Sequence, residues 1–210
     1  MSNEIIAYTT ASKIYADKGV ACNATWHRYC KKAVLLSSHG SAPFTKVCDA
    51  DGVESHLAKQ AAGVYQACHD VKKGFDGWFI FTCDDTWVNI KALQAYIDCF
   101  DPSAPSMHGQ RLNRDGITFP SGGAGMLMSA RTLVRFLEKP FPVPVALRYG
   151  WSDVRFGIQA EQMGIDIVHN SGFHSQPWDE MTRMSDVLGA FTWHHITSKT
   201  MIALDMLEQL

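Results

Sequence analysis

Short apolar runs alternate along the chain with longer segments in which apolar residues recur at helical spacing. The runs have the length of buried strands and lie at residues 5–10, 33–37, 78–82, 165–168 and 191–195. The first long helical segment, residues 54–72, keeps one apolar face through Leu57, Ala61 and Val64. Alternation of strands and helices of these lengths is typical of an α/β layer architecture.

Residues that end or cap helices mark the other helical segments. The signals are Pro102 as a stop, Ser129 and Ser152 as N-caps, Gly164 as a stop, and a last helix from near Ser198. Three prolines within residues 139–144 predict an irregular loop. No repeat or linker interrupts the pattern, so we expect one domain over residues 1–210.

Composition narrows the class of protein further. The chain has 210 residues, 46% hydrophobic and 19% charged, which is too apolar for a disordered protein. Nineteen basic residues against 21 acidic ones leave a net charge of -2, which argues against a nucleic-acid partner. The apolar runs are too short for a membrane span, and residues 5–7 are too few for the core of a signal peptide. The six cysteines contain no C-x-x-C pair and are interpreted as reduced thiols.

Two adjacent carboxylates follow the most apolar strand. Asp84 and Asp85 follow the run at 78–82 after one residue, Cys83, at a strand end where ligands bind in open α/β sheets. Carboxylate oxygens suit Mg²⁺ or Mn²⁺, and such ions bind diphosphates. The alternative is that the two residues are a turn and helix-start pair, as aspartates often are.

Three other segments carry possible chemistry, each with a plain structural alternative. Glycines at 122, 123 and 125 allow close backbone approach to a ligand, or form an ordinary tight turn. Asp153 lies in the first turn of a helix, where the helix dipole stabilises a carboxylate whatever its function. A lone histidine such as His174 is usually structural. Strand alternation predicts that His194 and His195 point to opposite faces, so at most one could face a given site.

The order of these segments is more specific than any one of them. The motifs are Asp-Asp-Thr-Trp-Val-Asn-Ile-Lys-Ala-Leu from 84, Ser-Gly-Gly-Ala-Gly from 121, Ser-Asp-Val-x-x-Gly from 152, Phe-His-Ser from 173 and Trp-His-His-Ile from 193. In this order they resemble the Fringe-like glycosyltransferases, which include the Fringe and core-1 β1,3-galactosyltransferase relatives of family 31. The resemblance extends from about Ile5 to the C-terminus.

The resemblance implies a GT-A (Rossmann-like) α/β fold with a central, mostly parallel mixed sheet. It also implies transfer of a sugar, with inversion, from a UDP-sugar donor to a glycan or glycoprotein acceptor. The implied cofactor is Mn²⁺, with Mg²⁺ as the alternative. Because Met1 leads almost directly into the first strand, we expect a cytoplasmic protein. The alternative is an excised catalytic domain of a lumenal Golgi enzyme.

The resemblance also assigns roles to residues. Asp85 and His174 match the positions that hold the metal, and Asp153 matches the catalytic base. The positions expected to contact the donor are Thr9, Thr10, Lys59, Cys83, Asp84, Gly122 and Gly123.

Two departures from the family pattern leave a second function open. Cys83 replaces the first acid of the family's Asp-Asp-Asp, and Ser152 replaces the first acid of its Glu-Asp pair. Both changes favour the alternative of a catalytically silent module that binds a nucleotide-sugar or a glycan. A zinc hydrolase using His169, His174 and His194 is the third reading, but no H-E-x-x-H spacing supports it.

Overall fold

A seven-stranded sheet forms the centre of the computed structural model, which describes residues 4–51, 53–138, 152–179 and 182–209. Its strands are β1 (Ile5–Thr10), β2 (Lys32–Ser37), β3 (Phe44–Lys46), β4 (Trp78–Cys83), β6 (Met107–Gly109), β9 (Met126–Ser129) and β10 (Ile167–His169). Their order is β10-β6-β9-β4-β1-β2-β3. Strand β9 is antiparallel to β4 and β6, and every other pair in this sheet is parallel. The prediction of an α/β fold with a mostly parallel sheet is confirmed.

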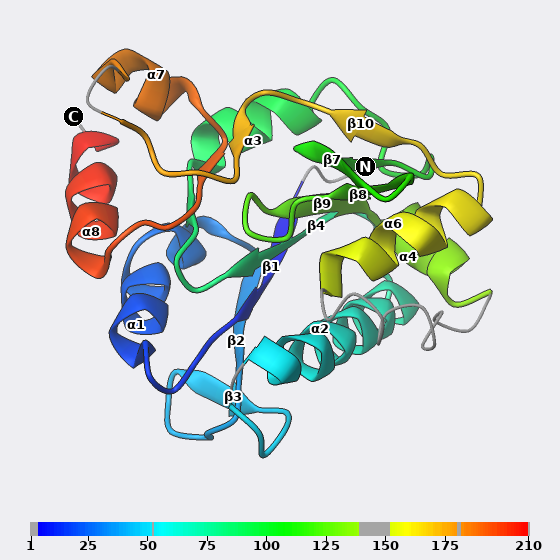
Figure 1. The fold of residues 1–210 in the computed structure, drawn as a ribbon, viewed down its shortest axis with the longest axis horizontal. Coiled ribbons are helices and arrows are strands. Elements are labelled where there is room, and N and C mark those ends of the chain that lie inside the picture. The colour runs from blue at the N-terminus through cyan, green and yellow to red at the C-terminus, as the bar shows by residue number, and fades with distance from the viewer. Residues whose placement is uncertain (1–3, 52, 139–151, 180–181, 210) are drawn as a thin grey trace.

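Helices cover both faces of this sheet (Figure 1). Those on one face are α1 (Ala16–Ala24), α3 (Ile90–Ile97) and α8 (Ser198–Leu207). Those on the other face are α2 (Val53–Lys72), α4 (Ala130–Phe136) and α6 (Ser152–Gln162). The remaining helical pieces are the 3-10 turn η1 (Trp26–Tyr29) and α7 (Met184–Gly189). Among the described helices, none has both the length and the apolar character needed to cross a membrane.

The two helical layers explain why the strand sequences are apolar throughout. In β4, Trp78 and Ile80 pack into the cluster beneath α1, α3 and α8, whereas Phe79 and Phe81 pack into the cluster beneath α2, α4 and α6. Side chains alternate between the faces of a strand, and here both faces are buried. The central strand therefore shows a continuous apolar run in place of a polar alternation.

The end signals in the sequence act largely as expected. Ser129 caps α4 by accepting a hydrogen bond from the backbone N–H of Thr132. Gly164 adopts a positive φ of 62° just after α6, where a glycine avoids strain. Ser152 is the first residue of α6 and not its cap, and the predicted loop at 139–144 lies outside the described residues.

Two small sheets were not predicted. One is the hairpin of β7 (Arg111–Arg114) and β8 (Ile117–Pro120). The other joins β11 (Phe173–His174), β12 (Thr192–Trp193) and β5 (Trp87–Val88), in the order β11-β12-β5. In this sheet Trp193 pairs with Trp87 on one side and with His174 on the other. It brings the C-terminal segment next to the turn that carries Asp84 and Asp85.

Candidate functional site

The acidic turn lies where two parallel strands of the central sheet end. Thr10, the last residue of β1, is in register with Cys83, the last residue of β4. The carboxyl ends of parallel strands are where open α/β sheets bind ligands. A cavity of about 420 Å³ opens here, and its lining includes Cys83, Gly122, Gly123, Asp153, His194 and His195.

Asp85 is surrounded by groups that can carry positive charge. Its Oδ1 lies 3.0 Å from Nε2 of His194, and its Oδ2 lies 3.5 Å from Nζ of Lys18 and 3.5 Å from Nδ1 of His195. Burial alone would raise the pKa of this carboxyl, but the hydrogen bond and charge of His194, with Lys18 and His195, lower it to about 2. Asp85 therefore stays ionised, as a cation ligand must.

The two nitrogens of His194 have different partners. Nδ1 lies 3.1 Å from the carbonyl oxygen of Ser175, which can only accept, so Nδ1 carries a proton. Nε2, the other ring nitrogen, faces Oδ1 of Asp85 at 3.0 Å. A ring that donates one N–H to a carbonyl and turns its other nitrogen toward a carboxylate is oriented as metal-ligating histidines are.

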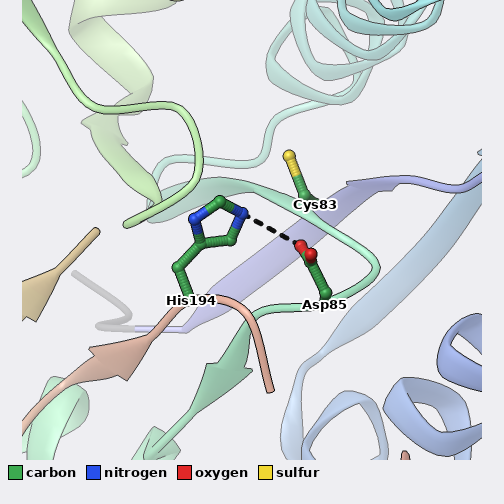
Figure 2. A group of neighbouring side chains, drawn as sticks. All are labelled: Cys83, Asp85 and His194. Carbon is green, nitrogen blue, oxygen red and sulfur yellow. Dashed lines mark ion pairs between the residues drawn. The ribbon is translucent and has the colours of Figure 1, made fainter. Parts of the chain in front are cut away.

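Cys83 completes a group of three different ligand types. One ligand atom from each of Cys83, Asp85 and His194 lies within 4.8 Å of the other two. Figure 2 shows the imidazole of His194 turned toward the carboxylate of Asp85, with Cys83 beside them. In the cation-free protein, burial and the charges of Asp85 and Asp84 raise the pKa of the thiol well above its usual range. The donor set fits a divalent cation.

The expectation for the two adjacent histidines is wrong. Both His194 and His195 lie against Asp85, and their ring centroids are 3.7 Å apart. The reason is that β12 ends at Trp193, and His195 adopts a positive φ of 60°. Strand alternation does not apply beyond that point, so the chain can turn both rings toward one carboxylate.

His174, expected to hold the metal with Asp85, lies elsewhere in this arrangement. Its ring stacks on Trp193, with centroids 3.8 Å apart and an interplanar angle of 5°. Its carbonyl accepts a hydrogen bond from the N–H of His194 at 3.1 Å. Among the described residues, His174 forms no ion pair with Asp85 and is not part of the three-ligand group. These contacts position His194.

Asp153 lies on another part of the cavity wall, with different surroundings. Its Oδ2 accepts the N–H of Gly122 at 3.0 Å, and its Oδ1 accepts the N–H of Val154 at 3.0 Å. Burial raises the pKa of this carboxyl, and the backbone hydrogen bonds offset only part of the effect. Each oxygen keeps a lone pair, so the group can still accept a proton.

The glycine loop joins these two parts of the site. A Cβ on Gly122 would lie 3.2 Å from Cβ of Asp153, and a Cβ on Gly123 would overlap the ring of His194. The hydroxyl of Thr86, next to Asp85, donates to the carbonyl of Gly123 at 2.8 Å. Two consecutive glycines therefore let the carboxylate of Asp153 and the imidazole of His194 approach the same loop.

Asp84 points away from the Asp85 group. It is 7% exposed, and its Oδ2 accepts the N–H of Ser12 at 2.8 Å. Burial raises its pKa to about 7, although the hydrogen bond from Ser12 acts in the opposite direction. Neighbouring carboxyls in one turn thus have opposite shifts of pKa. Asp84 ties the acidic turn to the segment after β1.

The other residues expected to contact a donor are engaged inside the protein. The hydroxyl of Thr9 lies 2.9 Å from Nε2 of His27 and 2.8 Å from the hydroxyl of Thr82. The hydroxyl of Thr10 donates to the carbonyl of Thr82 at 3.3 Å. Lys59, 1% exposed, pairs with Asp51 at 2.8 Å. These side chains brace the strand ends.

Sequence reasoning missed the roles of His194 and Lys18. Each lies against Asp85, but from a segment more than 60 residues away along the chain. The His194-His195 pair was a usable signal, since it was already part of a motif. Alternation along a strand, however, predicted that the two rings point to opposite faces. Lys18 carried no local signal, because a lysine on a helix is ordinary.

Comparison with known proteins places the chain in a family. The family described as Fringe-like matches residues 6–187. Curated relatives include the beta-1,3-glucosyltransferases of Mus musculus, 24% identical over 203 residues, and Homo sapiens, 23% identical over 175 residues. The Xenopus laevis glycoprotein-N-acetylgalactosamine 3-beta-galactosyltransferase 1 is 26% identical over 125 residues.

These matches cover unequal shares of the two chains. They include 90%, 80% and 58% of this chain, but 40%, 34% and 34% of the mouse, human and frog relatives. The chain therefore spans about a third to two-fifths of the length of these relatives. A solved glycosyltransferase involved in the glycosylation of the major capsid of PBCV-1 aligns over 99% of this chain and 100% of its own, with a TM-score of 0.47 and 15% identity.

Proposed function

Because the chain belongs to the Fringe-like family, we propose that it is an inverting glycosyltransferase that uses a UDP-sugar donor and a divalent cation. The proposed acceptor is a hydroxyl of a glycan or glycoprotein. One observation carries the proposal: Cys83 and His194, which form a ligand group with Asp85, line one cavity together with Asp153, and two consecutive glycines lie between them.

The cation would be held by Asp85 and His194, with His194 in the role expected of His174. Asp85 supplies an ionised oxygen and His194 a nitrogen whose orientation is fixed by Ser175. When bound, a divalent cation such as Mn²⁺ stabilises the negative charge that develops on the leaving diphosphate. Lys18, 3.5 Å from Asp85, contributes a further positive charge beside that position.

Asp153 is the proposed general base. In an inverting transfer the acceptor hydroxyl attacks the anomeric carbon from the side opposite the diphosphate, and its proton must go to the enzyme. Burial makes Asp153 a stronger base than a solvated aspartate, because the raised pKa means a tighter hold on a proton. The N–H groups of Gly122 and Val154 fix its orientation before the acceptor arrives.

The donor side of the cavity would be shaped by Gly122 and Gly123, which leave room for a sugar ring above the loop. The nucleotide is proposed to bind at the ends of β1 and β4. The residues that support this region without contacting the donor are Asp84, Thr9, Thr10 and Lys59.

Slow hydrolysis of the donor tests the proposal without knowledge of the acceptor. The protein is incubated with a panel of UDP-sugars, with and without MnCl₂, and release of UDP is measured. We expect at least one donor to yield cation-dependent UDP, which the Asp153→Asn variant does not release. A thermal-shift panel of the same nucleotides, with the cation present, identifies which of them binds.

The same pair of measurements separates catalysis from silent binding. Binding of a UDP-sugar without any release of UDP, even with acceptor glycans added, would indicate a nucleotide-sugar-binding module and not an enzyme. Absence of both binding and release across the panel would contradict the proposal altogether.

A further inference from the structure

A sulfur atom lies among the donor atoms of the proposed cation site. Cys83 is the last residue of β4, and its thiol belongs to the group whose ligand atoms lie within 4.8 Å of one another. It is a free thiol that lines the same cavity as His194. Figure 2 shows Cys83 beside Asp85 and His194.

The type of donor atom decides which cations a site prefers. Oxygen donors suit Mg²⁺ and Mn²⁺, whereas thiolate and imidazole together select softer ions, of which zinc is the commonest in proteins. Three protein ligands with a fourth position left open are the pattern of zinc sites that also bind a substrate atom. The general order of affinities also places zinc well above manganese at nitrogen- and sulfur-containing sites.

The geometry supports coordination by all three residues. His194 is oriented by Ser175, and Asp85 follows Cys83 by two residues in a turn whose ends are tied to other segments. The carbonyl of Asp85 accepts the N–H of Ile196 at 2.9 Å, and the N–H of Asp84 donates to the carbonyl of Thr10 at 3.0 Å. The ring of His194 and the backbone of the turn that carries Cys83 and Asp85 are therefore held before any cation binds, which lowers the cost of assembling the site.

We propose that Cys83, Asp85 and His194 form a thiolate-containing site that binds Zn²⁺ in preference to Mn²⁺. The inference rests on the proposed function for the place of the cation, but zinc binding needs neither donor nor acceptor. Cys83 thus adds a sulfur donor, which changes the preferred ion. An acidic residue at this position would add an oxygen donor instead.

Co²⁺ is the probe for sulfur coordination, because thiolate ligands give it a charge-transfer absorption in the near ultraviolet. Titration of the metal-free protein with CoCl₂, in a thiol-free reductant, should produce this band with one equivalent bound, and ZnCl₂ should abolish it. Calorimetry with ZnCl₂ and MnCl₂ should give zinc an affinity at least about tenfold higher.

Two variants locate the sulfur. Cys83→Ser should lose the band and weaken zinc binding on the order of 10- to 100-fold, while its affinity for Mn²⁺ changes little. Cys99→Ser, which removes an exposed thiol, is the matched control and should keep both the band and the zinc affinity. Cys83→Asp should narrow the preference for Zn²⁺ over Mn²⁺.

A measurement on the unmodified protein guards against variants that do not fold. Alkylation of each cysteine is followed by peptide mass spectrometry, and Zn²⁺ should slow modification of Cys83 but not of Cys99, whereas Mn²⁺ should slow neither. A cobalt band that persists in Cys83→Ser, equal affinities for the two ions, or no protection of Cys83 would each overturn the inference. If zinc binds through Cys83 but no UDP-sugar is bound or hydrolysed, the proposed function fails and the zinc site stands.

Discussion

Asp85 and Asp153 are carboxylates of one site with opposite environments. Asp85 lies within 3.5 Å of a lysine and two histidines, and its pKa falls to about 2 despite burial. Among the described residues, the hydrogen bonds that Asp153 accepts come from backbone N–H groups, and burial raises its pKa. Both are largely shielded from water, so the difference comes from their neighbours and not from their depth.

The contrast indicates that Asp85 and Asp153 are suited to different chemical roles. A carboxylate that stays ionised at all working pH values is suited to hold a cation, and one with a raised pKa is suited to take a proton. The two glycines keep these environments adjacent but separate, since Gly122 contacts Asp153 and Gly123 contacts His194. Variants that exchange or blur the environments therefore test the assignment.

Asp153→Asn should have the largest effect on the reaction. An amide of the same shape cannot accept the acceptor's proton, so turnover should fall by about 10²- to 10⁴-fold. Affinity for UDP with a cation should not change, because Asp85 and His194 are untouched. Steady-state kinetics and calorimetry on the same preparation check both parts, and unchanged turnover would remove Asp153 from the role of base.

Asp85→Asn should act on binding. It removes the ionised ligand and leaves Lys18 and His194 without their common partner. We expect cation-dependent UDP affinity to fall by at least about 100-fold, the upper end of what loss of an outer-shell partner costs at a metal site. Calorimetry with and without the cation measures it. Equal loss in the cation-free titration would show that Asp85 does not act through a cation.

The comparison also shows what the sequence could predict. Strands β1, β2 and β4 and several helix ends follow from local patterns, whereas β3, β6 and β9 of the central sheet were not predicted. The apolar run of β4 reflects burial on both faces, and Ser129 caps α4 by accepting a hydrogen bond from the N–H of Thr132. Both features leave their signal within a single segment of the sequence, so they can be read from one segment at a time.

The arrangement around Asp85 could not be read in that way. Strands β5, β11 and β12 have two residues each, and they exist because distant segments pair. The positive φ of His195, which turns its ring toward Asp85, has no signal in a non-glycine residue. The motifs included both histidines, but which of them lies beside Asp85 depended on this tertiary contact.

Gly123→Ala should disturb the surroundings of Asp85 without changing those of Asp153. Its Cβ would overlap the imidazole of His194, so the ring must move from Asp85, and cation-dependent UDP affinity should fall by about tenfold. Gly122→Ala should instead affect turnover, because its Cβ meets Cβ of Asp153 at 3.2 Å. Gly189→Ala, where a Cβ meets nothing within 4 Å, is the matched control. If the two loop variants have the same kinetic effect, the glycines do not separate the two environments.

Asp84→Asn should change the reaction least, because it acts on stability and not on chemistry. Burial raises the pKa of Asp84 to about 7, so the folded protein holds a proton that the unfolded chain has released above its ordinary pKa of 3.8. The resulting stabilisation is complete below pH 3.8 and is lost as the pH rises to about 7. The variant cannot ionise, and its amide oxygen can still accept the N–H of Ser12.

The variant should therefore match the wild-type protein near pH 4 and exceed it at pH 8, by on the order of 2–4 kcal/mol in the free energy of unfolding. Thermal denaturation across this range measures the difference. Burial also raises the pKa of Glu208 to about 7, so Glu208→Gln is the control for a second carboxyl that titrates in the same window. A pH profile that Asp84→Asn leaves unchanged would mean that Asp84 is ionised in the folded protein, like Asp85, and that adjacent carboxyls in this turn do not differ.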